Sequence, residues 1–459
     1  MLTSAYNAWT AASQLRARRL RQKRYTYGQQ WLDPVTDING RVMTEQELFA
    51  RQGRSPLTNN MIRQLVKCVI GNYRSSIADN DPAAKIPVDP ETATRNSLLE
   101  MDCRMLEEFL ISGCAIQRVT VENRVAGRGV WVDNVSPDDF FVNRFTDPRG
   151  LDIELVGMLH SWSLREVLMR FGRSEKMRRL IRQAYSPAMM PGPALASTLS
   201  ADFFTAPDGR CRVVEVWSLE QRNLTKCVDL ASGKPFEIPS SESHLIKDEN
   251  RRRRADGRQP LRSAATATLR WHCRFYAPNG LLLDEFDSPY AHGLHPFAVK
   301  FFPLTDGEVH SFVEDIIDQQ RTVNRMITLI DHIVGVSAKG ILLFPADQKP
   351  DGITWAEVGK IWAQPDAVLP YDPQGSTVSP RQIVATGNDA GASNLLSMEL
   401  QLLQQISGVS DAMQGKISTS NQSAALFDSQ LRSSAIALLD LLDSFNSFRL
   451  ARNGLIARS

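Results

Sequence analysis

The chain has 459 residues, of which 42% are hydrophobic and 23% charged, and its formal net charge is +2. This length allows about two to four domains with enough apolar material for several cores. The sequence has no apolar run of the roughly 18 residues that a membrane-spanning helix needs, and its N-terminus lacks the apolar core of a secretory signal. Six scattered cysteines without a CxxC pair favour reduced, mostly buried thiols in a cytosolic setting.

The N-terminal residues 1–30 are expected to be helical and strongly basic. Six Arg and Lys residues fall between Arg16 and Arg24, and no acidic residue precedes Asp33. Such a run indicates a contact with nucleic acid or with an acidic neighbouring subunit, or simply a solvated helix face. A further helix is expected after residue 58, with Thr58 or Asn59 as its N-cap.

The middle of the chain alternates helical and strand-like patterns. A helix over 94–113 is predicted to end near Gly113, and strand-like segments follow it. Ser163 is predicted to cap a later helix. Residues 184–210 are rich in Pro, Ala, Ser and Gly, which indicates a loose loop.

Two strands, over 212–220 and 225–230, are expected next. The four arginines Arg251–Arg254 indicate a charged turn or short helix, for which surface solvation is favoured over DNA contact. The segment 268–290 is typical of a β-hairpin with its turn at 278–280.

The longest periodic segment runs from Asp306 to Val334. Its apolar residues recur every three or four positions, which predicts one helix about 40 Å long. A segment rich in Pro and Gly follows, with strands and turns expected in it, and helical patterns resume from Asn388 and break near Gly415.

Tests for catalytic motifs are negative, because the sequence contains no GxxxxGK[ST], GxSxG or HExxH pattern. His292 and His295 could bind a metal with nearby acids, but they stand in a Pro/Gly-rich loop and not on one helix face. Other acid pairs could serve a hydrolase, yet each has a simpler structural interpretation as exposed or divergent side chains. The acids concerned are Asp284, Glu285 and Asp287 near the histidines, and the pairs Asp138 with Asp139 and Asp315 with Asp318.

Three groups of residues, taken in order, resemble portal proteins of tailed bacteriophages, particularly the short-tailed type. The first combines Tyr27-Gly28-Gln29-Gln30-Trp31 with Arg54-Ser55-Pro56-Leu57-Thr58-Asn59-Asn60-Met61-Ile62. The second comprises Asp139-Phe140-Phe141, Asp147-Pro148-Arg149-Gly150, Trp162, Ser163 and Glu166. The third comprises His295-Pro296-Phe297, Gly307-Glu308-Val309, Asp318-Gln319-Gln320-Arg321 and Asn324. The resemblance extends from about residue 20 to 445.

The resemblance implies a mixed α+β, mainly helical subunit that assembles as a ring, usually of twelve copies, at one capsid vertex. The implied regions are a wing (1–305), a stem helix (306–336), a small α/β clip (337–390), a second stem or tunnel helix (391–413), a tunnel loop (414–423) and a C-terminal wing or crown-side helix (424–459). Expected partners are double-stranded DNA in the channel, the terminase large subunit, the major capsid protein, a scaffolding protein and a head-tail adaptor. The protein would be a non-enzymatic virion component, assembled in the host cytoplasm, without a cofactor or a metal.

By this resemblance the channel candidates fall in the tunnel loop and the stem. A small, polar loop with one cation suits transient contact with sliding DNA, because each phosphate neutralised adds affinity; a flexible connection between helices is the simpler interpretation. The loop candidates are Lys416, Ser418, Thr419, Ser420, Asn421 and Gln422, and the stem candidates are Arg321, Arg325, Asp318 and Gln319. The alternatives are another phage connector or adaptor, and a metal-dependent hydrolase using His292 and His295.

Overall fold

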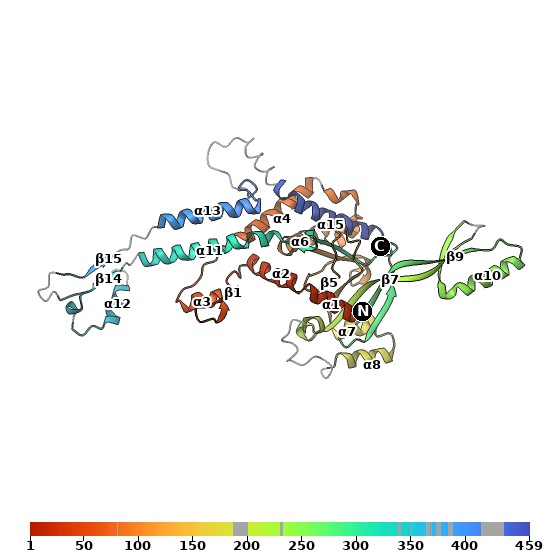
Figure 1. The fold of residues 1–459 in the computed structure, drawn as a ribbon, viewed down its shortest axis with the longest axis horizontal. Helices are drawn as coiled ribbons and strands as arrows, with labels where there is room; N and C mark the ends of the chain where they lie inside the picture. The colour runs from red at the N-terminus through yellow and green to blue at the C-terminus, as the bar shows by residue number, and fades with distance from the viewer. Residues whose placement is uncertain are drawn as a thin grey trace. The chain divides into compact units, whose positions relative to one another are not determined.

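A computed structural model describes residues 1–79, 81–186, 201–229, 233–337, 341–349, 351–363, 368, 370–372, 378–383, 389–414 and 436–459. The chain is mixed α/β, as predicted, and folds into two compact units (Figure 1). Each unit is built from segments that are distant in the sequence. Unit 1 comprises Met1–Leu20, Ile70–Phe312 and Leu438–Ser459, and unit 2 comprises Arg21–Val69 and Val313–Ala437.

Unit 1 is organised around two antiparallel sheets. The larger sheet has the strand order β10-β9-β7-β6-β5, with β8 also paired to β7, and the smaller has the order β11-β3-β4. The strands are β3 (Cys114–Arg124), β4 (Gly127–Asn134), β5 (Phe140–Val142), β6 (Leu155–Trp162), β7 (Cys211–Val228), β8 (Pro235–Pro239), β9 (Arg262–Tyr276), β10 (Leu282–Asp287) and β11 (Phe297–Phe301), with a small hairpin of β12 (Pro303–Thr305) and β13 (Glu308–Val309).

The helices of unit 1 follow the expected local signals. Helix α6 ends at Gly113, as predicted, because this C-cap residue adopts a left-handed conformation (φ 71°) that glycine tolerates. Ser163 accepts a hydrogen bond from the backbone N–H of Glu166 and caps α7, also as predicted. The helices are α1 (Leu2–Ala11), α5 (Pro90–Arg95), α6 (Leu98–Ser112), α7 (Leu164–Phe171), α8 (Glu175–Ala184), α9 (Ala201–Phe204), α10 (Ser243–Ala255) and α15 (Leu439–Ala457), with short 3₁₀ turns at Pro82–Lys85, Pro207–Gly209 and Ser240–Glu242.

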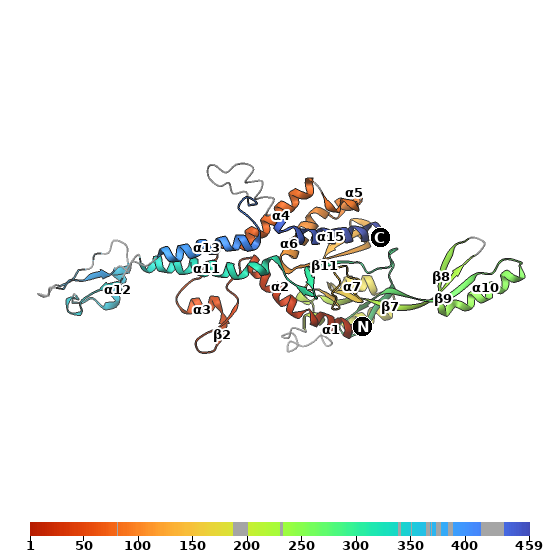
Figure 2. The same ribbon diagram turned by 45° about the horizontal axis from the view of Figure 1, so that its top comes forward.

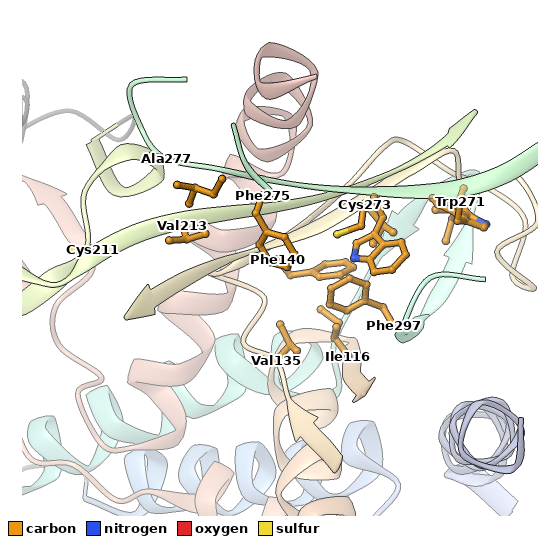
Figure 3. Close-up of a cluster of buried hydrophobic side chains, with 14 of the residues drawn as sticks. Ile116, Val135, Phe140, Cys211, Val213, Trp271, Cys273, Phe275, Ala277 and Phe297 are labelled. Carbon is orange, nitrogen blue, oxygen red and sulfur yellow. The ribbon is translucent and has the colours of Figure 1, made fainter. Parts of the chain in front are cut away.

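The main hydrophobic core of unit 1 lies between the two sheets (Figure 3). Val213 and Phe275 come from the larger sheet, and Ile116 and Phe297 come from the smaller one. Phe297 meets Phe140 edge-on, with ring centroids 5.6 Å apart. The first half of β7 is buried on both faces: Cys211, Val213 and Trp217 join this core, whereas the alternating Val214 and Val216 join a second core on the other face.

The two strands predicted over 212–220 and 225–230 are in fact one strand, β7. Its pairing with β9 continues without a break from Val214 opposite Tyr276 to Val228 opposite Arg262. The polar residues 221–223 suggested an interruption, but they remain in register with β9 and simply occupy an exposed part of the ladder.

The far parts of β7 and β9 join β8 and α10 in a small lobe, residues 223–270, which we call the α10 lobe (Figure 2). Its own core consists of Cys227, Ile246 and Leu261, with Ile238 packed against them. The arginines Arg251–Arg254 lie within a 13-residue helix of this lobe, and not in a turn.

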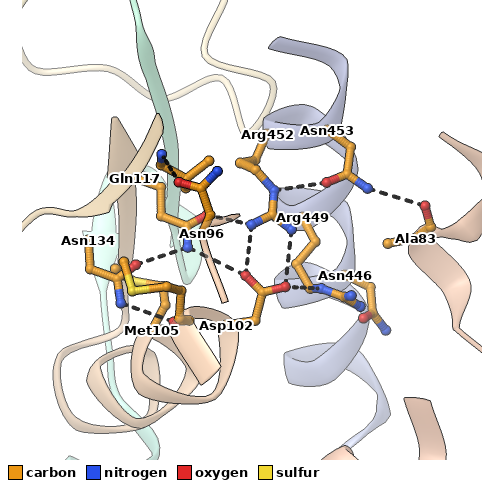
Figure 4. Close-up of polar contacts among 12 residues, drawn as sticks. Ala83, Asn96, Asp102, Met105, Gln117, Asn134, Asn446, Arg449, Arg452 and Asn453 are labelled. Atoms are coloured by element: carbon orange, nitrogen blue, oxygen red, sulfur yellow. Dashed lines mark hydrogen bonds and ion pairs between the residues drawn. The ribbon is translucent and has the colours of Figure 1, made fainter. Parts of the chain in front are cut away.

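The C-terminal helix α15 is fixed to unit 1 by buried charges (Figure 4). Asp102 of α6 accepts hydrogen bonds from Arg449 at 2.8 Å and from Arg452 at 2.9 and 3.0 Å. Arg449 also donates to Asp81 at 2.7 and 3.0 Å. Two guanidinium groups are thus balanced by two carboxylates, which makes this interior arrangement tolerable.

Unit 2 contains a long helix, α11 (Phe312–Ser337), and a second helix, α13 (Asp389–Ser407), that runs beside it in both views (Figures 1 and 2). Between them in sequence lie the hairpin of β14 (Ile341–Leu343) and β15 (Arg381–Ile383), a 3₁₀ turn (Ala346–Gln348) and α12 (Trp355–Ala363). The strand-and-turn segment expected there therefore also contains a helix. The N-terminal part of the unit adds β1 (Pro34–Thr36), β2 (Val42–Thr44) and α3 (Glu45–Arg51), while α2 (Ser13–Thr26) and α4 (Met61–Asp79) contribute residues to both units.

The predicted start of the long helix at Asp306 is wrong by six residues. Asp306 (φ 54°) and Gly307 (φ 84°) adopt left-handed conformations that close the β12–β13 hairpin, and a right-handed helix cannot contain them. Val309 fitted the helical period by coincidence. The division into wing, stem and clip is not tested by these two units and remains a prediction.

Candidate functional site at the base of the long helix

A stripe of buried polar side chains runs along the middle of α11. Gln320, Asn324 and Thr328 are four residues apart, so they lie on one face of the helix, and all are at most 6% exposed. Opposite them runs the backbone of residues 57–62, which carries the start of α4. Buried polar groups need hydrogen-bond partners, and here the two segments supply them to each other.

Gln320 satisfies the first backbone groups of α4. Its Oε1 accepts from the N–H groups of Met61 at 2.9 Å and Ile62 at 3.2 Å, and its Nε2 donates to the carbonyl of Asn59 at 2.7 Å. The first N–H groups of a helix have no partner within the helix, so Gln320 acts as a cap supplied from another helix. The local N-cap of α4 is Asn60, whose Oδ1 accepts from the backbone N–H of Arg63 at 3.1 Å. The prediction of Thr58 or Asn59 as the N-cap was therefore wrong.

Asn324 extends the network to the loop after α2. Its Oδ1 accepts from Asn59 N–H at 3.0 Å, and its Nδ2 donates to Oε1 of Gln30 at 2.5 Å. Gln30 in turn donates to Asn60 Oδ1 at 3.1 Å and to the Tyr25 carbonyl at 2.7 Å. We call Gln30, Asn60, Gln320 and Asn324 the amide cluster.

Ion pairs continue the contact on the adjoining face of α11. Glu45, whose side chain is 4% exposed, accepts from Arg321 at 2.6 Å and forms a second ion pair with Arg325. Asp33 pairs with Arg21 at 2.8 Å and accepts from the Tyr25 hydroxyl at 2.9 Å. The two arginines stand four residues apart, so a single carboxylate bridges one turn of the helix.

The electrostatics favour the charged forms of these groups. Burial alone would raise the pKa of Asp33, but the hydrogen bonds from Arg21 and Tyr25 outweigh it and leave this pKa below its usual value. Burial likewise opposes the charge of Arg321, yet the hydrogen bond to Glu45 raises its pKa overall. The result is a fixed structural junction.

The predicted stem candidates fall into two groups. Arg321 and Arg325 are engaged within the subunit, although the Arg325 side chain remains 50% exposed. Asp318 is 83% exposed, and Gln319 is half-buried with its Oε1 lacking a hydrogen-bond partner among the described residues. The tunnel-loop candidates, Lys416 and the polar residues 418–422, lie outside the described residues. The stem candidates and the tunnel-loop candidates therefore both remain predictions as channel residues.

The histidines considered for a metal site are occupied by local contacts. The Nδ1 atoms of His292 and His295 accept from backbone N–H groups at 3.0 and 3.2 Å. Burial lowers the pKa of His295 to about 4, so its ring, packed edge-on against Trp271, is neutral near pH 7. Within the described ranges no group of three His, Cys, Asp or Glu side chains is placed to hold a metal ion.

The acids considered for hydrolysis are held by cations. Near the histidines, Asp284 pairs with Arg173 at 2.7 Å, and Asp287 with Arg222 at 3.1 Å. The other acids separate as the structural interpretation predicts. Asp138 contacts Arg19 at 2.5 Å, Asp139 contacts Arg212 at 3.3 Å, and Asp315 and Asp318 lie exposed on α11.

The basic N-terminal run also has a structural role that the sequence did not suggest. Arg19 is buried and makes a two-pronged contact with Glu108 at 2.6 and 2.7 Å. Arg16 stacks over the Trp9 ring at 3.7 Å. Arg16 and Arg19 therefore make contacts within the subunit, and neither a free DNA-binding face nor a solvated helix face describes these two residues.

Sequence reasoning missed Glu45, Asp33 and Thr328 as parts of the junction. Glu45 and Thr328 have partners more than 270 residues away, and no local pattern marks such contacts. Asp33 contacts Arg21 and Tyr25 from outside any regular period of the sequence. The amide cluster could have been suspected from the sequence, because all four of its members lie in the segments that carried the family resemblance.

Comparison with known proteins gives one family. Among the described residues, no helix combines the length and the apolar character that crossing a membrane requires. A search of curated proteins found no significant match. The sequence model described as "Phage P22-like portal protein" matches residues 2–453, nearly the whole chain. The chain therefore belongs to the phage P22-like portal protein family, the structural head-to-tail connectors of tailed bacteriophages.

Proposed function

We propose that this chain forms a ring, of about twelve copies, at one capsid vertex, and that the ring conducts the genome during packaging and ejection. The observation that carries the proposal is the family match over nearly the whole chain. In this proposal α11 and α13 are the stem, the segment 337–390 is the clip, and a separate terminase supplies the energy.

An exposed apolar stripe on α13 supports assembly with copies of the same chain. Leu395, Met398 and Ile406 are 49%, 53% and 45% exposed, and with the half-buried Leu402 they recur at three- and four-residue steps. Such a stripe on a helix calls for a second apolar surface. A ring supplies one at every subunit, since each contact in it is head-to-tail.

The proposed clip is rich in exposed apolar side chains, which suits a docking platform. Trp355 is 50% exposed and Val368 86% exposed, and Leu343, Tyr371, Val378 and Ile383 are also exposed. Aromatic anchors of this kind concentrate binding energy at protein interfaces. We assign this surface to the terminase large subunit during packaging and to head-tail adaptor proteins afterwards.

The near-neutral charge suits a channel through which DNA slides. A net charge of +2 on 459 residues cannot hold many phosphates, and each phosphate held would oppose sliding through counterion release. The same proposal places the major capsid protein and a scaffolding protein around the ring as assembly partners.

Assembly is tested by electron microscopy and native mass measurement of the purified protein. We expect rings of about twelve copies, and replacement of Leu395, Met398 and Ile406 by serine should leave mainly monomers. A matched control replaces three exposed apolar residues of unit 1, Val125, Leu151 and Met169, by serine and should still form rings. A protein that stays monomeric at high concentration would refute the ring.

The clip is tested separately with Trp355→Ala in ring-forming protein. We expect unchanged rings that no longer retain the terminase large subunit in a pull-down, because the aromatic anchor is lost. Retention equal to the wild type would refute the assignment of this surface.

A further inference from the structure

The α10 lobe carries a local excess of positive charge. Residues 223–270 contain ten Lys and Arg against six Asp and Glu, a net charge of +4, whereas the whole chain carries only +2. The remainder of the protein is therefore slightly acidic. A local excess of this size attracts anions to the lobe.

One face of α10 gathers the cations around a hollow. Lys247, Asn250, Arg251 and Arg254 stand at helix positions i, i+3, i+4 and i+7, and they line a hollow with a volume of about 350 Å³. The side chain of Asn250 is fixed, because it exchanges two hydrogen bonds with the backbone of Leu261 at 2.6 and 3.0 Å. These two bonds hold the cationic face in one orientation on the lobe.

Intramolecular ion pairs do not account for these cations. Arg253 turns inward to Asp229 at 3.2 Å and Glu249 at 3.1 Å. Arg251 has only a loose, exposed pair with Asp248 at 3.6 Å, and Lys247 and Arg254 form no ion pair with any other residue that the structure describes. Basic residues do stabilise a helix C-terminus. This interaction with the helix dipole is confined to the last turn, however, and Lys247 lies about two turns before the C-terminus of α10.

The chemistry of the hollow fits phosphate groups better than a protein surface. All four residues that line it carry polar or charged groups, and the exposed Leu245 lies on the opposite side of α10. Protein interfaces need a dry apolar centre, which this face lacks. Guanidinium groups match phosphate oxygens with paired hydrogen bonds. We propose that the Lys247–Arg251–Arg254 face of the α10 lobe binds the backbone of double-stranded DNA, without reading its sequence.

This site is additional to the proposed channel, whose candidate residues belong to the stem and the tunnel loop. From Lys247 to Arg254 the helix rises about 10 Å, and duplex DNA carries one phosphate per about 3.4 Å on each strand. Three phosphates can therefore lie opposite the three cations. Loss of three such contacts lowers the slope of log affinity against log salt by about 2.7. Across 50 to 200 mM salt this slope corresponds to about 40-fold in affinity.

The test measures binding of covalently closed circular duplex DNA to the full chain at several salt concentrations. A closed circle cannot be threaded through a closed ring, so channel binding does not contribute, and the site can be measured in a monomer as well. The test variant is Lys247→Gln/Arg251→Gln/Arg254→Gln. The matched control, Lys176→Gln/Arg179→Gln/Arg182→Gln, removes the same charge from three exposed positions on α8. A third variant, Lys247→Arg/Arg251→Lys/Arg254→Lys, retains the charge.

We expect the test variant to lose about 2.7 from the salt slope, while the control and the charge-retaining variant keep the wild-type slope. Circular dichroism should show that all three variants are folded. A test variant that binds like the wild type, or a control that loses as much, would overturn the proposal. So would a result in which polyglutamate binding depends on these three residues while DNA binding does not. Failure of ring assembly leaves this result unaffected, so the two proposals fail separately.

Discussion

Gln320→Met is the sharpest test of the junction at the base of α11. Methionine fills a similar space but removes the acceptor for Met61 and Ile62 N–H and the donor to Asn59. Each buried backbone group left without a partner costs about 1–3 kcal/mol. Met61 N–H keeps its hydrogen bond to the Asn59 carbonyl at 2.9 Å, so the fully buried Ile62 N–H is the group left unpaired, and we expect a loss of about 1–3 kcal/mol. Against a typical unfolding free energy of about 5–15 kcal/mol, a loss of this size is readily measured.

The chain provides a matched control one residue away. Gln319 is half-buried, and its Oε1 has no hydrogen-bond partner among the described residues. Gln319→Met therefore breaks no contact made by that oxygen and should be neutral or slightly stabilising. The two variants make the same chemical change on adjacent positions of one helix, so their difference isolates the capping contact.

Amide hydrogen exchange is the direct assay. A loss of about 2 kcal/mol corresponds to about 30-fold faster exchange at Ile62, whose amide depends on Gln320, whereas Met61 keeps its bond to the Asn59 carbonyl. Urea unfolding of the same proteins should show the matching decrease in the unfolding free energy. If Gln320→Met and Gln319→Met lose equal stability and equal protection, the capping argument is wrong.

Three further predictions concern packing and charge. Asp102→Ala should lower the free energy of unfolding in urea by about 3–5 kcal/mol, because it leaves buried guanidinium charge uncompensated. Asp81→Ala should cost less, since the Asp81 side chain is 29% exposed. Equal losses in the two variants would contradict this. The lowered pKa of Asp33 means that its stabilising contribution is complete above the unfolded-state value of about 3.9 and is lost as pH falls through the lower folded-state pKa. Acid unfolding of Asp33→Asn should lack this dependence, and an unchanged pH profile would refute it. Gly157→Ala should cost at least about 3 kcal/mol or abolish folding, because its Cβ would lie 2.1 Å from the Glu215 carbonyl; near-normal thermal stability would contradict this.

Local features of the fold were predictable because local physics determines them. The end of α6 at Gly113 and the cap of α7 at Ser163 follow from backbone geometry and one side-chain hydrogen bond. The hairpin turn at residues 278–280 is likewise confirmed, between β9 and β10. The long helix was found from its period of apolar residues, yet its start was misplaced, since periodicity does not detect the left-handed Asp306 and Gly307.

The remaining features depend on contacts between distant segments. The discontinuous units bring residues 21–69 against α11, and no pattern in either segment specifies that pairing. Charges were the least predictable, because Arg19 looks the same in sequence whether it meets solvent, DNA or Glu108. The amide cluster lies between the local features that were predictable and the distant contacts that were not. Its residues were recognised as a family pattern, but only the structure relates Gln320 to the start of α4.

The uninterrupted ladder between β7 and β9 has a mechanical consequence. Fifteen residue pairs, from Val214 opposite Tyr276 to Val228 opposite Arg262, form a ribbon about 48 Å long. Its inner end is part of the buried core, and its outer end carries α10. A ribbon without a bulge has no hinge, so it behaves as a cantilever: a load on the lobe becomes a torque on the central sheet.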